Sequence, residues 1–233
     1  MPNATRLKVR ASVPARPCMW PGDAPDWNIA MSETSVLRYK PDILTVGLDI
    51  IFCGLNPAAS AVADGHSFSH PTNRFWTVLH LAGCTDTRLR PEQERRLLGY
   101  GCGITTAVGR PTRRAGEVTS DEFRTARPGL EATIRRYAPR AVGFLGKHAL
   151  ATMLGKREID WGLYAPGFAN TPTWVLPNPS GLNRTFTLDA LVRAYTAPRA
   201  ALAQGSSTRP ATTARRRLDH RSTNVSRGTS SRR

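Results

Sequence analysis

Residues 49–60, DIIFCGLNPAAS, decide the expected fold, because a short apolar run ends abruptly in small and turn-forming residues. The apolar run at residues 50–53 is typical of a buried strand. Gly54 permits a tight exit from this strand, and Pro57 stiffens the backbone just past Asn56. We therefore expect a buried strand that ends in a turn presenting a polar amide.

Other apolar runs alternate with segments of helical periodicity. The further expected strands are GITTAV (103–108), AVGFLG (141–146) and TWVLPNP (173–179). The expected helices are NRFWTVLHLAG (73–83), PEQERRLLGYG (91–101), TSDEFRTARPGLEATIRRYAP (119–139), KHALATMLG (147–155) and TLDALVRAY (187–195). We expect Asn73 to cap the first of these helices, and Pro128 with Gly129 to interrupt the third. Strands that alternate with helices predict parallel pairing and an α/β sandwich.

The composition limits the classes of function. The chain has 233 residues, of which 40% are hydrophobic, and a formal net charge of +16. This charge favours a polyanionic partner such as nucleic acid, although an Arg-rich solvated surface explains it equally well. The four cysteines form no CxxC or Cys/His cluster, so the sequence predicts no disulfide framework, metal site or iron–sulfur cluster. No stretch approaches the ~20 apolar residues of a membrane span, and we see no signal peptide, so we expect an intracellular protein.

Three regions follow from the distribution of apolar residues. Residues 1–40 contain many prolines and no sustained period, so we expect a poorly ordered N-terminal extension. Residues 205–233 are dominated by Ser, Thr and Arg, so we expect a disordered basic C-terminal tail that either grips DNA or has no role. The predicted globular domain spans residues 41–204.

The segment of residues 54–76, GLNPAASAVADGHSFSHPTNRFW, has the features of a ligand site. Asn56 would be a fixed amide able to donate and to accept hydrogen bonds, and Phe68 offers a flat stacking face. The small residues 58–60 keep the loop thin, so that a ligand could approach the backbone N–H groups. A plain strand-to-helix turn with a capping asparagine explains the same residues.

The segment of residues 174–184, WVLPNPSGLNR, also follows a strand. Ligands of parallel α/β sheets bind outside the carboxyl ends of the strands, so we expect this segment to share one cleft with residues 54–60. Asn178 lies between two prolines, and Leu182 is flanked by Gly181 and by a basic residue. An exposed leucine in this setting suits a wedge that enters a base stack. The alternative is an ordinary loop whose leucine folds back onto the core.

Taken together, the motifs GLNPA, HPTNRFW and NPSGLNR resemble the mismatch-specific uracil/thymine-DNA glycosylases of the uracil-DNA glycosylase superfamily. Bacterial members carry GINPG, HP-NRFW and NPSGL-R in the same order, and the resemblance covers about residues 42–202. It implies a three-layer α/β/α sandwich with a short, mostly parallel central sheet. It also implies a monofunctional enzyme of base excision repair that flips uracil, or a related base, from a G-mismatched duplex and hydrolyses its N-glycosidic bond.

The resemblance also implies roles for particular residues. Asn56 matches the asparagine that orients the attacking water, and Asn178 helps to shape the pocket and the water site. The expected base pocket consists of Leu55, Pro57, Ala58, Ala61 and Phe68. The expected wedge and opposite-base contacts are Gly181, Leu182, Asn183 and Arg184.

Two departures from the bacterial pattern leave the substrate range open. Ala58 replaces a glycine close to the base, and His66 is closer to the eukaryotic thymine-processing branch. Uracil opposite guanine is the expected substrate, with thymine, ethenocytosine and hypoxanthine as alternatives. No lysine lies in either motif, so we expect no strand-cleaving lyase activity.

We expect no cofactor and no metal, no membrane association, and a monomer acting on double-stranded DNA in the bacterial cytoplasm, associated with the nucleoid. A non-catalytic module that binds lesions or mismatches on the same fold is the main alternative. A superfamily branch with an iron–sulfur cluster is disfavoured because the required cysteine spacing is missing.

Overall fold

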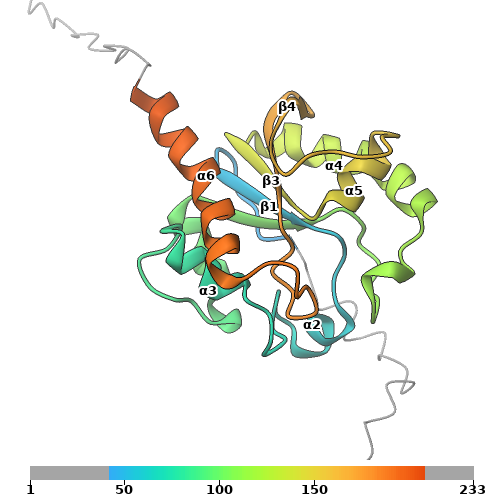
Figure 1. Ribbon diagram of the computed structural model, residues 1–233, viewed down its shortest axis with the longest axis horizontal. Helices are drawn as coiled ribbons and strands as arrows, with labels where there is room; N and C mark the ends of the chain where they lie inside the picture. The colour runs from blue at the N-terminus through green and yellow to red at the C-terminus, as the bar shows by residue number, and fades with distance from the viewer. Residues whose placement is uncertain (1–41, 208–233) are drawn as a thin grey trace, which may run out of the picture.

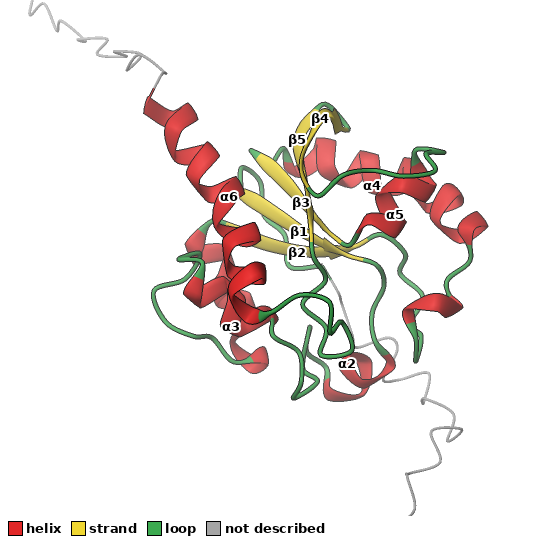
Figure 2. Cartoon of the chain, in the orientation of Figure 1, coloured by secondary structure: helices red, strands yellow, loops and turns green. Residues whose placement is uncertain are grey.

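The computed structural model describes residues 42–207 of the chain. At the centre of this part lies a five-stranded sheet in the order β2-β1-β3-β5-β4 (Figures 1 and 2). The strands are β1 (Ile50–Gly54), β2 (Cys102–Thr106), β3 (Ala141–Leu145), β4 (Gly162–Phe168) and β5 (Thr171–Leu176). The first four in spatial order pair in parallel, and β4 is antiparallel to β5 at one edge. The carboxyl ends of β1, β2, β3 and β5 therefore meet at the same edge of the sheet.

Both faces of the sheet are buried, which explains why the strands read as continuous apolar runs. In β1, Ile51 and Cys53 belong to the hydrophobic cluster on one face, whereas Ile50 and Phe52 belong to the cluster on the other. All four side chains are 5% exposed or less. Cys53 thus acts as a small core residue.

Helices cover the two faces in separate layers (Figure 1). The first layer contains α4 (Ser120–Tyr137) and α5 (Lys147–Met153). The second contains α3 (Phe75–Leu81), the 3-10 helix η1 (Pro91–Tyr100) and α6 (Leu188–Ser207). Two shorter pieces, α2 (Ala59–Asp64) and η2 (Ala115–Glu117), lie in the loops. The predicted α/β/α class with a mostly parallel sheet is confirmed.

The expected interruption of α4 at Pro128 and Gly129 is wrong, because one helix runs through both residues. A proline inside a helix costs about 3 kcal/mol. The helix is held on both sides of it: Thr119 and Glu122 form a capping box at its start, and Phe123, Leu130 and Ile134 are buried along it. Packing and capping thus outweigh the local preference.

The expected N-cap of α3 is displaced by one residue. Arg74 occupies the cap position, and the Asn73 side chain accepts a hydrogen bond from the Phe75 N–H at 3.0 Å. Asn73 therefore does satisfy an amide of the first turn, but from one position earlier in the chain.

The strand β4 was not expected, because GLYAPGF reads as a turn-rich segment. As an edge strand it tolerates Pro166, which falls in the register shift between Tyr164 and Phe168. Its side chains are mostly half-buried or exposed, so it lacks the apolar run that identified the other strands.

Helix α6 reaches Ser207, past the predicted end of the domain at residue 204. The predicted extension at residues 1–40 and the tail beyond residue 207 lie outside the described residues. Among the helices of residues 42–207, none is long and apolar enough to span a membrane.

Candidate functional site

A cavity of about 510 Å³ opens at the carboxyl edge of the sheet. It is lined by the turn after β1, the segment around residues 67–73, the loop after β2 and the loop after β5. The predicted site residues in its lining are Leu55, Asn56, Pro57, Ala58, Ala61, Phe68, Asn178, Gly181 and Leu182. Asn183 and Arg184 are not part of the lining. The two sequence motifs thus meet at one cavity, as the strand-end rule predicted.

The Asn56 amide is held in one orientation by its neighbours. Its Nδ2 donates to the carbonyl oxygens of Pro57 at 3.1 Å and Arg110 at 3.0 Å, and to the Thr112 Oγ1 at 2.7 Å. A carbonyl oxygen cannot donate, so only the NH₂ group can face these partners. The Asn56 Oδ1 has no hydrogen-bond partner among the described residues, and it is left to accept from a ligand in the cavity.

Thr112 fixes the orientation further. Its hydroxyl donates to the Arg114 carbonyl at 2.9 Å, so the oxygen must accept from Asn56. Thr112 is 5% exposed and sits in the loop after β2. No sequence motif indicates a role for Thr112, although its loop follows the strand that pairs in parallel with β1 and therefore emerges at the same edge.

The loop that supplies the Arg110 carbonyl is anchored to α4. The Arg110 side chain pairs with Glu122, with 2.6 Å between Nε and Oε1, and also donates to the Glu117 carbonyl at 2.8 Å. Hydrogen bonds from Arg110, then from the Thr119 amide, lower the pKa of the Glu122 carboxyl to about 2. This carboxylate stays ionised at neutral pH, so the loop position is maintained there.

Asn178 is oriented in the opposite sense to Asn56. Its Oδ1 accepts from the Ser180 N–H at 2.9 Å, and its backbone carbonyl accepts from the Asn183 side chain at 2.9 Å. The Asn178 NH₂ group has no partner among the described residues. The cavity is therefore lined by one amide that presents an acceptor and another that presents a donor.

Phe68 supplies a flat apolar wall. Its ring stacks on Phe75, with 3.9 Å between centroids and 24° between planes, and it lines the cavity. Its backbone has a φ of 54°, a left-handed conformation that is unusual for a bulky residue. The neighbouring Ser67 is fixed by its N–H to Glu94 at 2.7 Å and by its carbonyl to the Trp76 indole at 3.2 Å. Such strain persists only where the surroundings impose it, which is common at functional sites.

We expected the backbone N–H groups of residues 58–60 to be open to a ligand, and for Ala59 this expectation is wrong. The Ala59 N–H donates to the Thr112 carbonyl at 2.9 Å, and α2 begins at the same residue. The Ala59 amide is therefore engaged rather than open to a ligand. Ala58 and Ser60 still line the cavity, and Ala58 pairs with Thr112 in an isolated bridge.

Arg74 organises the loop that carries Leu182. All three nitrogens of its guanidinium donate to backbone carbonyl oxygens at distances from 2.7 to 3.4 Å. The four acceptors are the carbonyl groups of Pro179, Ser180, Asn183 and Phe186. Gly181 packs so tightly against Thr72 that any Cβ at this position would clash. The HPTNRFW motif therefore fixes the conformation of the NPSGLNR motif, a relation that neither motif reveals alone.

Leu182 points outward, with 87% of its surface exposed. The alternative in which this leucine folds back onto the core is wrong. Asn183 instead turns inward and braces the loop through Asn178. Arg184 is exposed and makes no hydrogen bond or ion pair within residues 42–207.

Two cationic residues that sequence analysis did not single out, Arg113 and Arg114, line the cavity. They follow Thr112 directly, so the loop that holds Asn56 also places positive charge beside the cavity. His66, by contrast, is absent from the lining and lies 3.4 Å from Glu94. Among the described residues, no group of three or more His, Cys, Asp or Glu could hold a metal ion.

Comparison with known proteins identifies relatives. A family model described as the uracil DNA glycosylase superfamily matches residues 41–198. The chain is also similar to the solution NMR structure of a candidate uracil DNA glycosylase from Methanosarcina acetivorans, with 19% sequence identity and a TM-score of 0.45. That similarity covers 70% of this chain and 96% of the other.

We predict that Arg74→Gln loosens the loop of residues 179–186 without unfolding the domain, because the shorter amide cannot reach four carbonyl groups. Amide hydrogen exchange in this loop should accelerate tenfold or more, as expected when hydrogen bonds of about 1 kcal/mol each are lost. Arg184→Gln is the matched control, since it removes an equal charge from a side chain that makes no hydrogen bond or ion pair within residues 42–207. Unchanged exchange in Arg74→Gln would contradict the assignment.

Proposed function

The chain belongs to the uracil DNA glycosylase superfamily, and we propose that it is a monofunctional, mismatch-specific DNA glycosylase that releases uracil or a related base paired with guanine. The observation that carries this proposal is the Asn56 amide, whose NH₂ is occupied by three acceptors while its oxygen has no hydrogen-bond partner within residues 42–207. An oxygen fixed in this way can hold a water molecule through one of the water's hydrogens. The water oxygen then keeps a lone pair for attack.

The reaction is hydrolysis of the bond between the base and C1′ of the sugar. The electron pair of this bond leaves with the base, the sugar becomes oxocarbenium-like, and the water held by Asn56 adds to C1′. The water then loses a proton to solvent, and the base anion takes up a proton from solvent. An amide is not a strong base, so the rate depends on the placement of the water and on stabilisation of the departing anion. A slow enzyme is therefore expected.

The walls of the cavity suit a planar base. The face of Phe68 that is not covered by Phe75 stacks on the extruded base. The unpartnered NH₂ of Asn178 donates either to the water or to a base oxygen. Because a stacking face accepts any planar ring, the preference for uracil over thymine, ethenocytosine or hypoxanthine rests on the space beside Ala58 and on the donors around it.

In this proposal, the loop of residues 181–184 distinguishes mismatched base pairs from normal ones. Leu182 fills the gap that the extruded base leaves, and it is already exposed in the free protein. Gly181 and Arg184 lie on the same loop and would contact the widowed guanine, whereas Asn183 holds the loop in place through its hydrogen bond to the Asn178 carbonyl. Extrusion costs a few kcal/mol and least for a mispaired base, so weak pairing selects part of the substrate before any pocket contact forms.

A lyase step would need an amine nucleophile beside C1′. None of the described residues that line the cavity is a lysine. The product is therefore expected to be an intact strand with an abasic site. We expect the enzyme to act as a monomer on DNA in the cytoplasm.

We predict that the full-length protein releases uracil from G·U duplexes faster than from A·U duplexes, and that Asn56→Ala lowers the single-turnover rate by about a hundredfold or more, because the water loses its fixed position. Duplexes with G·T and G·ethenocytosine measured in the same series define the substrate range.

Thr112→Val is the companion variant, since it removes one acceptor of the Asn56 amide and keeps the side-chain shape. It should slow release while leaving DNA affinity unchanged, and Thr112→Ser should restore it. Binding without release from any of these duplexes would instead support a non-catalytic module.

We also predict that Leu182→Ala slows release from duplex DNA by roughly tenfold or more, on the scale of the ~1.5–3 kcal/mol gained by burying a leucine side chain. Release from single-stranded DNA should change little, because no stack has to be refilled there. Equal losses on both substrates would argue against the wedge.

A further inference from the structure

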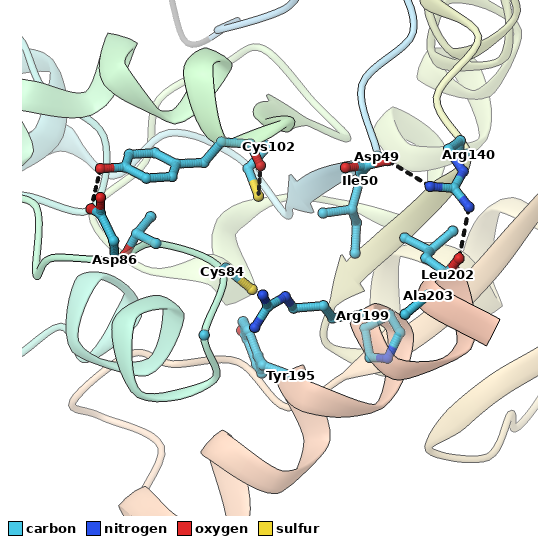
Figure 3. Close-up of a pocket in the computed structure, with 14 residues that line it drawn as sticks. Asp49, Ile50, Cys84, Asp86, Cys102, Arg140, Tyr195, Arg199, Leu202 and Ala203 are labelled. Atoms are coloured by element: carbon cyan, nitrogen blue, oxygen red, sulfur yellow. Dashed lines mark hydrogen bonds and ion pairs between the residues drawn. The ribbon is translucent and has the colours of Figure 1, made fainter. Parts of the chain in front are cut away.

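A second cavity, of about 570 Å³, lies at the edge of the sheet where β1 and β2 begin, opposite the candidate active site. It is bounded by Asp49, which precedes β1, by Cys102 at the start of β2, by the loop after α3 and by one side of α6 (Figure 3). The volume is within the range of sites for small molecules. None of the residues assigned to base release lines it.

Two neighbouring cysteines line this cavity. Cys84 comes from the loop after α3 and Cys102 from the first residue of β2, and the two side chains interact as neighbours. Cys102 is 3% exposed, and its thiol also lies 3.6 Å from the Tyr100 carbonyl, to which it donates. Cys84 is half-buried and is therefore the more accessible of the two sulfurs.

A guanidinium lies next to the accessible thiol. Arg199 of α6 covers Gly83 so closely that a Cβ there would clash, and Figure 3 shows its guanidinium beside the Cys84 sulfur. The carboxylates that line the cavity are engaged elsewhere: Asp49 accepts from Arg140 at 2.9 Å, and Asp86 accepts from the Tyr100 hydroxyl. Among the described residues Arg199 forms no ion pair, so its charge is available to a thiolate.

The two sulfurs differ in their readiness to ionise. The interaction with the neighbouring Cys102 side chain, followed by the charge of Arg199, lowers the pKa of the Cys84 thiol. The same interaction and burial raise the pKa of Cys102. The thiolate is the nucleophilic form of cysteine, so Cys84 would react first.

We propose that Cys84 and Cys102 form a dithiol site that reduces small-molecule disulfides, with Cys84 as the attacking sulfur and Cys102 as the resolving one. The Cys84 thiolate attacks one sulfur of the small disulfide, whose S–S bond breaks and whose other half leaves as a thiolate that takes up a proton. Cys102 then loses its proton and attacks the Cys84 sulfur, which releases the second small thiol. The protein dithiol is oxidised by two electrons to a Cys84–Cys102 disulfide, and one small disulfide is reduced to two thiols.

Cys53 provides an internal control for accessibility. It is 1% exposed, and burial raises the pKa of its thiol. Modification of Cys53 would report unfolding rather than reaction at the cavity. Cys53, Cys84 and Cys102 fall on different tryptic peptides, because an arginine separates each from the next.

The test treats the reduced full-length protein with glutathione disulfide at neutral pH, followed by alkylation and peptide mass spectrometry. The wild type should yield a bridge between the Cys84 and Cys102 peptides, whereas Cys102→Ser should stop at one glutathione attached to Cys84. Cys84→Ser should give neither product, and Arg199→Gln should slow formation of the adduct several-fold. Cys53 should remain unmodified in every case.

Two outcomes would overturn the proposal. One is the absence of a glutathione adduct on Cys84 in Cys102→Ser while Cys53 remains protected. The other is modification of Cys102 in Cys84→Ser at the wild-type rate, which would show that Cys84 is not the attacking sulfur.

Discussion

The hydrogen bonds that saturate the Asn56 NH₂ group are the constraint on which the proposed site depends. They join the turn after β1 to the loop after β2, and they leave an amide oxygen with no partner in the described part of the chain to accept from a ligand. An asparagine free to rotate would present donor and acceptor alternately and could not hold a water in one orientation. The parallel pairing of β1 with β2 makes this possible, since both strands end at the same edge.

The opposite wall of the cavity is fixed by different means. Arg74 donates hydrogen bonds to four backbone carbonyl groups of the loop that bears Leu182. One long polar side chain therefore fixes this loop, which has no strand partner among residues 42–207. The buried Tyr195 of α6 donates its hydroxyl to the Pro177 carbonyl at 3.1 Å and so fixes the start of the same loop. The wedge is therefore preformed, and less conformational entropy has to be lost when DNA binds.

Much of the architecture could be predicted from the sequence, because strands buried on both faces read as apolar runs. The helix through Pro128 and the strand β4 could not, since long-range packing outweighs local propensity in the first and an edge strand needs no apolar run in the second. The motifs identified the residues of the cavity but not their supports. Thr112 and Arg74 act through contacts across 56 and more than 100 residues of chain, which no local pattern encodes.

The most direct test of this account is a crystal structure of the protein bound to a G·U duplex whose target nucleotide carries a 2′-fluorine that slows hydrolysis. The account predicts an extruded uracil stacked on Phe68, Leu182 in the vacated stack, and a water within hydrogen-bond distance of the Asn56 Oδ1 below C1′. A water held by another group, or an Asn56 amide turned so that its NH₂ faces the sugar, would contradict it.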